Sequence, residues 1–411
     1  MTDLTVSVIV VSRCRPVALK RCLTGISQLQ FDPFEVIVVA DPEGIAAAGT
    51  LTFSDHLKLV AFDEPNISAA RNLGVEHAAG DIVAFIDDDA VPEPQWLHYL
   101  VAPANQSDVA ALGGFVRGRN GISFQWRARS LDAQGFSHHI NVDAQKATVL
   151  TPPEGRAVKT EGTNMAFRRD VLLDLGGFDT AFHYFLDETD VNMRLARAGH
   201  ATAIAPLAEV HHGFDANSTR TRGRVPRDLF DIGASWAVFQ RKHLPEPAHQ
   251  GHWADIRADQ RRRVLGHFVQ GRLEPGDVRH LMRRLDAGYE EGRQRVLGRV
   301  ALAAHPRAPF KRFPSKERAS VLIATRPIHG AAALAEARER VKSGEIVTVL
   351  NLSPTGIFHQ LRFDDEGFWM QKGGVFGRSD RKDPLIRLTT RAKRVKRERA
   401  RVAIQRGLGE E

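Results

Sequence analysis

Residues 6–89 alternate short apolar runs with segments that have helical spacing. The apolar runs, each followed by polar or turn-forming residues, lie at 6–11, 34–39, 56–62 and 82–86. Between them, helix-start signals stand at Pro16 and Asn66, ahead of segments that extend to Leu29 and Ala79. Strands and helices that alternate in this way are joined by right-handed crossovers in a mostly parallel sheet. We therefore predict an α/β fold for this part of the chain.

The apolar run at 82–86 ends abruptly in three aspartates, Asp87, Asp88 and Asp89. A buried strand that ends this way brings its carboxylates to the edge of the sheet where open α/β folds bind ligands. Three carboxylates this close repel one another unless a cation is present. Oxygen ligands of this kind suit Mg²⁺ or Mn²⁺, which in turn can hold phosphates. The triplet indicates a metal–diphosphate site, and an acidic loop after a strand is the alternative.

Two further residues belong near the same predicted sheet edge. Asp41 follows the second apolar run, where its carboxylate can accept a hydrogen bond from a nucleobase or a ribose hydroxyl. An Asx turn with Pro42 is the alternative for Asp41. Arg71 lies in the first turns of the helix before the aspartates, and a guanidinium matches the oxygens of a diphosphate well. For Arg71 the alternative is a solvated position on the helix surface.

A second acidic group lies about a hundred residues downstream. Asp187 and Glu188 begin a predicted helix at 187–198, behind an aromatic run at 182–185. A carboxylate held there can take the proton from an acceptor hydroxyl as it attacks an electrophilic carbon. Acidic residues at a helix N-terminus are also stabilised by the helix dipole, without any catalytic role.

Two short motifs lie on either side of this helix. In the run Gly162-Thr163-Asn164, the glycine allows a ligand to approach the backbone closely. His211 and His212 end a strand-like run, and imidazole is an acceptable ligand for Mn²⁺. A surface or structural role is the alternative for the histidine pair.

Basic residues outnumber acidic ones by 57 to 49, which gives a net charge of +8. They concentrate at 261–263, at 283–284 and in a C-terminal run of Arg391, Lys393, Arg394, Lys396, Arg397, Arg399 and Arg401. A basic surface favours a polyanion, either anionic lipid or nucleic acid, and a solvated helix face is the alternative. We expect reversible attachment to an anionic membrane surface and no nucleic-acid partner.

The chain has two cysteines, Cys14 and Cys22, and no apolar run long enough to span a membrane. Residues 1–4 lead at once into a strand-like run, without the basic and apolar regions of a secretory signal. We therefore expect a reduced, cytoplasmic protein that is peripheral at the inner face of the membrane.

A length of 411 residues suits about two or three domains. We predict an α/β domain at 1–217, a basic helical extension at 218–299 and a small C-terminal α/β domain with a basic tail at 300–411. Prolines at 245, 247 and 275 break the helical extension, and prolines at 306, 309 and 314 indicate a linker over 300–318.

Taken in order, these motifs resemble those of the family 2 glycosyltransferases, which have the GT-A nucleotide-sugar-binding fold. The motifs that carry the resemblance are VSVIVV at 6–11, EVIVV at 35–39, NISAARNLG at 66–74, GDIVAFIDDD at 80–89, GTNMAFRR at 162–169, GGFD at 176–179, DETDVNMRL at 187–195 and VHH at 210–212. The resemblance covers about residues 5–215, and residues 300–411 match no family that we can name.

The resemblance implies a nucleotide-diphosphate sugar as donor, Mg²⁺ or Mn²⁺ as cofactor, and a hydroxyl of a glycan or lipid-linked acceptor. It also implies direct displacement at the anomeric carbon with inversion. The roles that it assigns are a metal ligand for Asp89 and His211, donor contacts for Asp41, Arg71, Asp87 and Asp88, and the acceptor side for Gly162, Thr163 and Asn164. Glu188 becomes the general base and Asp187 the second candidate.

The chain departs from the family pattern at two places. Ala40 stands where the family usually has an aspartate, which puts the base contact in doubt. The order of the two acids at 187 and 188 is swapped relative to the family's Glu-Asp pair.

Two other functions remain open from the sequence. A nucleotidyltransferase on a similar fold would release pyrophosphate, but the loop at 12–16 lacks the glycine that such enzymes usually have after the first strand. A non-catalytic protein that binds glycans or membranes is the other alternative, and the intact acidic motifs disfavour it.

Overall fold

The computed structural model of the chain describes residues 4–106, 108–213, 219–221, 223–298 and 301–409. The first residues of the predicted N-terminus and both predicted domain boundaries, at 217/218 and 299/300, lie outside these residues. The boundaries therefore stay predictions, whereas the elements on either side of them can be described.

The N-terminal half of the central sheet is parallel and has the strand order β3-β2-β1-β4. Its strands are β1 (Val6–Ser12), β2 (Phe34–Ala40), β3 (Leu57–Ala61) and β4 (Ile82–Asp87). The helices between them are α1 (Pro16–Ile26), α2 (Pro42–Gly49) and α3 (Ile67–His77). The four predicted apolar runs thus form these four strands, and the prediction of an α/β fold with a mostly parallel sheet is confirmed.

The sheet continues beyond β4 through one reversed strand. β12 (Asn164–Arg168) is antiparallel to both β4 and β6 (Val109–Arg117), and β13 (Ala201–His212) is parallel to β6. Because one strand is reversed between them, β6 and β13 run in the same direction as β4. The carboxyl ends of β1, β4 and β13 therefore meet at one edge of the sheet.

Short strands and helices complete this part of the molecule. The strands are β5 (Ala90–Pro92), β7 (Phe124–Trp126) and β10 (Thr148–Leu150) in the central sheet, and β8 (Arg129–Leu131), β9 (Ser137–His139) and β11 (Ala157–Lys159) in a separate three-stranded sheet. The helices are α4 (Trp96–Val101), α5 (Arg169–Asp174) and α6 (Asp187–Arg197). Within the described residues, short 3₁₀ helices lie at Ser54–His56, Ala102–Asn105, Glu246–Ala248 and Pro327–His329.

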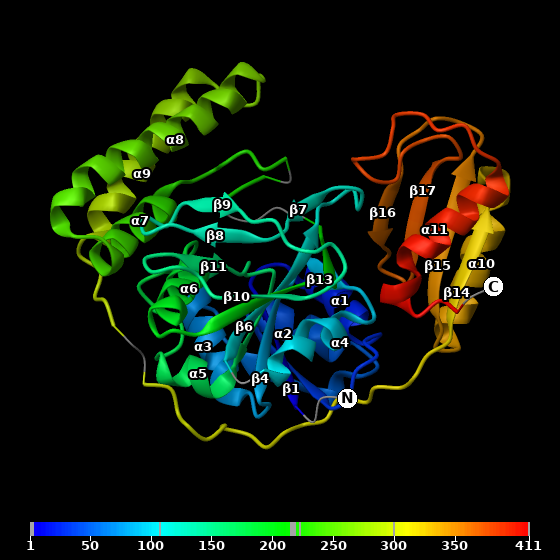
Figure 1. Ribbon diagram of the computed structural model, residues 1–411, viewed down its shortest axis with the longest axis horizontal. Coiled ribbons are helices and arrows are strands. Elements are labelled where there is room, and N and C mark those ends of the chain that lie inside the picture. Colours follow the sequence, from blue (N-terminus) through cyan, green and yellow to red (C-terminus); the bar gives the residue numbers. More distant parts are fainter. Residues whose placement is uncertain (1–3, 107, 214–218, 222, 299–300, 410–411) are drawn as a thin grey trace.

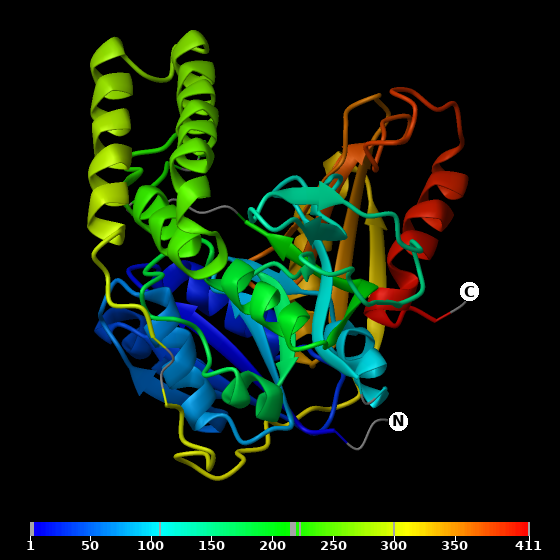
Figure 2. The same ribbon diagram turned by 60° about the vertical axis from the view of Figure 1, so that its left-hand side comes forward.

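Three helices follow the central sheet, and they are separated at the predicted proline breaks. They are α7 (Phe230–His243), α8 (His249–Val269) and α9 (Pro275–Gly292). Figure 2 shows α8 and α9 standing side by side and projecting away from the sheet. The ring of Trp253 stacks on that of Tyr289, with a centroid separation of 3.8 Å, and so holds the two helices together.

The C-terminal residues form a second, four-stranded sheet with the order β14-β15-β17-β16. Its strands are β14 (Ser320–Thr325), β15 (Ile346–Ser353), β16 (Gln360–Phe363) and β17 (Trp369–Gly374), and its helices are α10 (Gly330–Lys342) and α11 (Arg391–Arg406). In Figure 1 this C-terminal unit lies on the opposite side of the central sheet from α8 and α9.

The predicted linker lacks helix and strand over its described residues 301–318, but it is packed against the central domain. The Phe313 ring lies 5.2 Å from that of Phe34, and the Phe313 amide donates to the Phe34 carbonyl at 2.7 Å. The Arg307 amide donates to the Glu76 carbonyl at 2.7 Å. The segment thus follows the lower side of the central sheet to the C-terminal unit (Figure 1).

Candidate active site and metal centre

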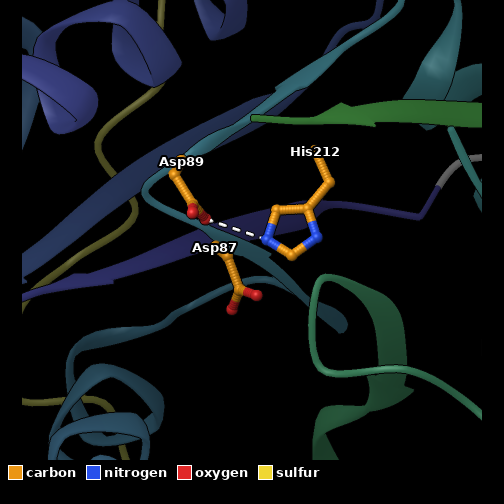
Figure 3. A group of neighbouring side chains, drawn as sticks. All are labelled: Asp87, Asp89 and His212. Atoms are coloured by element: carbon orange, nitrogen blue, oxygen red, sulfur yellow. Dashed lines mark ion pairs between the residues drawn. The ribbon is translucent and has the colours of Figure 1, made fainter. Parts of the chain in front are cut away.

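Asp87, Asp89 and His212 gather at the carboxyl edge of the central sheet (Figure 3). Asp87 ends β4, Asp89 follows it, and His212 ends β13. One ligand atom from each side chain lies within 4.8 Å of the others, and Nε2 of His212 lies 3.1 Å from Oδ1 of Asp89. The pairing of β5 with β13 brings Ala90 opposite His212 and so places the adjacent Asp89 beside the imidazole.

The donor set fits a divalent cation. Nδ1 of His212 lies 2.9 Å from Oε1 of Gln125, a position in which Nδ1–H donates and Nε2 presents its lone pair toward Asp89. This second contact orients the ring as outer ligand partners commonly do. Two carboxylates and one imidazole suit Mn²⁺ and, with more water in its shell, Mg²⁺.

His211, which sequence reasoning favoured as the ligand, faces away from this cluster. Its Nε2 lies 2.7 Å from Oε1 of Glu93, and its ring centroid is 4.7 Å from that of Trp369. Adjacent residues of a strand point to opposite faces, so only one of the two histidines can face Asp89. The structure gives that place to His212, and the ligand prediction for His211 does not fit its position.

Asp88 points into the protein rather than toward a donor. Its side chain is fully buried, accepts a hydrogen bond from Ser12 Oγ at 2.7 Å, and forms an ion pair with Arg15. Burial raises the pKa of Asp88 to about 7, against the opposing charge of Arg15. Arg15 also reaches Oδ2 of Asp89, at 3.1 Å. The predicted donor contact of Asp88 therefore does not fit this geometry.

Arg15 was missed in the sequence because the loop after the first strand was considered only for its lack of glycine. The buried carboxylates of Asp88 and Asp89 require a nearby cation. The basic residues of the loop at 12–16 were the sequence feature that could have indicated it.

Arg71 joins the two acidic motifs. Its guanidinium is buried, forms an ion pair with Asp187, and lies 3.7 Å from Oδ1 of Asp87. It also donates to the Gly162 carbonyl at 3.4 Å, and a Cβ at that glycine would lie only 2.6 Å from Nη2 of Arg71. Gly162 is therefore needed to make room for the arginine. Arg71 was predicted to bind the donor diphosphate, and that role stays a prediction; the structure places its guanidinium between Asp87 and Asp187.

Glu188 lies in the first turn of α6 and is held by Lys159 of β11. Nζ of Lys159 is 3.0 Å from Oε1 of Glu188, 3.3 Å from Oγ1 of Thr189 and 3.8 Å from Oε2 of Glu161. Burial favours the neutral acid, but Lys159 outweighs it and lowers the pKa of Glu188. The carboxylate is thus ionised at neutral pH, as a general base must be.

The neighbouring acids differ from Glu188 in their environment. Burial raises the pKa of Glu161 to about 7, against the attraction of Lys159. Burial likewise raises the pKa of Asp187, which has Arg71 as its partner. Sequence reasoning missed Lys159 because the segment at 117–160 has no motif, and only folding brings β11 against α6.

Two of the three predicted acceptor-side residues border the site, and the third does not. Thr163 Oγ1 donates to Oδ2 of Asp87 at 2.6 Å, and Gly162 contacts Arg71. Asn164 is fully buried. Its amide accepts from Trp96 Nε1 at 2.8 Å and donates to two backbone carbonyls, which commits it to joining strands in the core.

Asp41 has a structural position beside the first-strand loop. One carboxylate oxygen accepts from the Gly44 amide at 3.1 Å and so caps α2, and the other accepts from the Cys14 amide at 3.0 Å. The loop that it holds forms one wall of a cavity of about 540 Å³ next to the ends of β1 and β2. The cavity is also lined by Phe62, Asn66 and Tyr184.

With this geometry in place, the chain can be compared with known proteins. The sequence pattern that defines the glycosyltransferase-like family 2 matches residues 4–228, more than half of the chain. The chain belongs to this family. The resemblance inferred from the motifs is thereby confirmed, and with it the GT-A fold class.

Named relatives of this family 2 chain cover part of it. A glucosyl-dolichyl phosphate glucuronosyltransferase of Haloferax volcanii is 32% identical over 168 residues, which are 36% of this chain and 47% of that protein. The succinoglycan biosynthesis protein ExoM of Rhizobium meliloti is 41% identical over 152 residues, 37% of this chain and 46% of that protein. The family 2 chain thus spans about half the length of these curated relatives.

Among solved structures, a mannosyltransferase from Pyrobaculum calidifontis in complex with GDP-Man and Mn²⁺ is 16% identical to the family 2 chain. The match covers 71% of this chain and 88% of that one, with a TM-score of 0.40, which is too low to transfer any detail of the site.

Removal of His212 should weaken metal binding by this family 2 chain. Loss of an outer-shell partner commonly costs about 10–100-fold in metal affinity, so loss of a direct ligand should cost at least about tenfold. We expect His212→Ala to raise the dissociation constant for Mn²⁺ at least tenfold in an electron paramagnetic resonance titration. His138→Ala, a change at an exposed histidine, is the control. Equal Mn²⁺ affinity of the His212→Ala variant and the unmodified chain would exclude the site.

Replacement of Lys159 should shift the pH dependence of transfer. A base acts in its ionised form, so activity is lost as the pH falls through its pKa. Lys159 lowers the pKa of Glu188, whereas burial raises it. Removal of Lys159 should therefore raise the pKa of Glu188. We expect the acid limb of the kcat/KM profile to move to higher pH in Lys159→Met and to stay near its original place in Lys159→Arg. An unmoved acid limb in Lys159→Met would show that Glu188 does not set it.

Proposed function

We propose that the chain is an inverting, metal-dependent glycosyltransferase. It would transfer a sugar from a nucleotide-diphosphate donor to a hydroxyl of a glycan or lipid-linked acceptor. The observation that carries the proposal is the meeting of two acidic groups, far apart in the sequence, at one sheet edge. Arg71 contacts one carboxylate of each group, Asp87 among the candidate metal ligands and Asp187 beside Glu188.

The donor would lie along the carboxyl ends of β1 and β4. The cavity of about 540 Å³ suits a nucleoside, and Asp87, Asp89 and His212 would hold a divalent cation at the diphosphate. When bound, the cation would neutralise negative charge on the departing diphosphate. Arg15, 3.1 Å from Asp89, keeps the three-aspartate turn compact before a ligand enters.

The chemistry follows from the position of Glu188. The acceptor oxygen attacks the anomeric carbon from the face opposite the diphosphate and forms the new carbon–oxygen bond. The bond from the anomeric carbon to the phosphate oxygen breaks, and the nucleoside diphosphate leaves with that electron pair. Glu188 takes the hydroxyl proton, and a single displacement of this kind inverts the anomeric centre. Lys159 holds the Glu188 carboxylate in place, and Arg71 keeps Asp187 paired.

The acceptor class is supported by a relative. The name of the Haloferax volcanii protein specifies a sugar on a dolichyl phosphate, and we propose an acceptor of the lipid-linked or glycan class here. Over the described residues, the helices are too short or too polar to traverse a bilayer. We propose that the chain acts at the cytoplasmic face of a membrane, to which it attaches peripherally.

Replacement of Glu188 should separate transfer from donor binding. Loss of a general base commonly costs about 10²–10⁴-fold in rate. We therefore expect Glu188→Gln to lower kcat/KM by this amount, while Mn²⁺-dependent nucleotide binding in calorimetry stays within about twofold. The experiment begins with a panel of nucleotide sugars, and the anomeric configuration of the product is read by nuclear magnetic resonance.

Each outcome of that experiment has a meaning. Glu290→Gln, at an exposed position on α9, is the control variant. Full transfer by Glu188→Gln together with loss in Asp187→Asn would move the base to Asp187. Retention of the anomeric configuration would reject the single displacement. Release of pyrophosphate from nucleoside triphosphates would favour the nucleotidyltransferase alternative, and absence of any metal-dependent nucleotide binding would favour the non-catalytic one.

Membrane attachment should depend on the tip of the α8–α9 pair. Phe268 and Val269 at the end of α8 are 38% and 81% exposed, and exposed Arg261 and Arg272 lie nearby. The basic C-terminal run presents less positive charge to a membrane than its composition indicates, because Arg394 is buried.

Each basic residue near an anionic surface contributes about 1 kcal/mol, so Arg261→Gln with Arg272→Gln should reduce partitioning roughly 30-fold. The measurement is co-sedimentation with phosphatidylserine-containing vesicles. The same changes at Arg340 and Lys342 of α10 serve as the control. Equal binding to neutral and anionic vesicles would reject attachment through these basic residues.

A further inference from the structure

The side chain of Arg406, from the C-terminal unit, contacts the central domain. Arg406 ends α11, and its side chain forms a two-point ion pair with Glu93, with Nε to Oε2 and Nη2 to Oε1 both at 2.8 Å. Arg406 is 0% and Glu93 is 2% exposed. Two charges buried this deeply must be paired, so the contact holds the two parts of the molecule in one relative position.

Residues of three other segments complete this cluster. His211 lies 2.7 Å from Oε1 of Glu93, and Nη1 of Arg406 donates to Thr348 Oγ1 at 2.9 Å. The Arg406 guanidinium lies 4.2 Å from the ring centroid of Trp369, against which His211 also packs. We call Glu93, His211, Trp369 and Arg406 the Arg406 cluster.

The backbone connects the Arg406 cluster to the candidate metal ligands. Asp89 directly precedes β5 and Glu93 directly follows it. Strand β5 pairs with the end of β13, where His211 and His212 are adjacent. The Gly213 amide donates to the Asp89 carbonyl at 2.7 Å, and the Glu93 amide donates to the Glu209 carbonyl at 3.0 Å. At the end of this strand pair His212 faces Asp89, whereas the adjacent His211 faces Glu93 and the rest of the Arg406 cluster.

The C-terminal unit also forms part of a cavity that opens on these ligands. The cavity has a volume of about 450 Å³ and is lined by Asp89 and His212 on one side and by residues 360–365 on the other. The Leu361 amide donates to the Asn120 carbonyl at 2.9 Å, and Arg21 pairs with Asp365 at 2.5 Å, so contacts between the two parts of the molecule join residues that line this cavity.

We propose that the C-terminal unit, which lies outside the family match, positions the metal site through Arg406. The inference rests on the proposed metal-dependent function. Arg406 is a positioning residue: it holds Glu93 and His211, and these hold the strand pair that presents Asp89 and His212. A lysine cannot reproduce its role, because only the guanidinium fork makes two parallel hydrogen bonds to one carboxylate.

The test measures Mn²⁺ affinity directly by electron paramagnetic resonance, together with the thermal unfolding midpoint. We expect Arg406→Met to raise the Mn²⁺ dissociation constant about 10–100-fold, as outer-shell partners commonly do, and Arg406→Lys to give an intermediate value. Arg394→Met is the matched control, because Arg394 is an equally buried arginine of α11. It contacts His359 and Glu398 within the C-terminal unit, so its loss should leave Mn²⁺ affinity within about twofold.

The outcomes separate this proposal from the proposed function. No Mn²⁺ binding by the unmodified chain removes the metal site itself. A folded Arg406→Met variant with unchanged Mn²⁺ affinity overturns the positioning role while leaving the metal site intact. If Arg406→Met does not fold, Arg406→Lys decides: unchanged affinity there overturns the proposal, and weakened affinity at an unchanged unfolding midpoint supports it. Equal weakening by Arg394→Met would show a general loss of stability instead and would also overturn it.

Discussion

The crowding of carboxylates at one edge of the central sheet is the constraint on which the rest of this structure depends. Three of them, Asp87 to Asp89, lie at the end of β4, two begin α6, and most are buried. Like charges at this density and burial require nearby cations, and the protein supplies them from three separate segments: Arg15 after β1, Arg71 on α3 and Lys159 on β11. Each cation therefore joins segments that are far apart in the sequence, and these ion pairs shape the site together with the backbone.

The direction of β12 decides which groups can share the site. Since β12 alone is reversed between β4 and β6, the end of β13 returns to the edge that carries the aspartates. The same strand end then serves two purposes, because His212 faces Asp89 while His211 faces Glu93 and the C-terminal unit. The candidate metal centre and an interdomain contact are thus separated by the thickness of one strand.

Much of the fold could be predicted because its signals are local. Strands β1 to β4 show as apolar runs bounded by polar residues, and α3 shows its cap at Asn66. The strand-like run that ends at His211 and His212 is the end of the long strand β13, which continues through an irregular register between Ala205 and Val210. The basic C-terminal run was predicted as a tail, but it lies in α11, which ends at the buried Arg406. The acidic partner of Arg406 is more than 300 residues away and cannot be recognised from local composition.

The sequence by itself determined the chemistry available to this protein: aspartates at the end of a buried strand, an acidic pair at the start of a helix, and the order of motifs that places the chain in its family. Residue type and spacing are enough for that, because they follow from neighbours along the chain. The tertiary structure alone decided the partners. His212 and not His211 faces Asp89, because successive residues of a strand point to opposite faces. Asn164 lies in the core, and Asp41 caps a helix. The tertiary structure also placed Lys159 beside Glu188, because the cation that keeps a buried carboxylate ionised comes from whichever strand folding brings next to it.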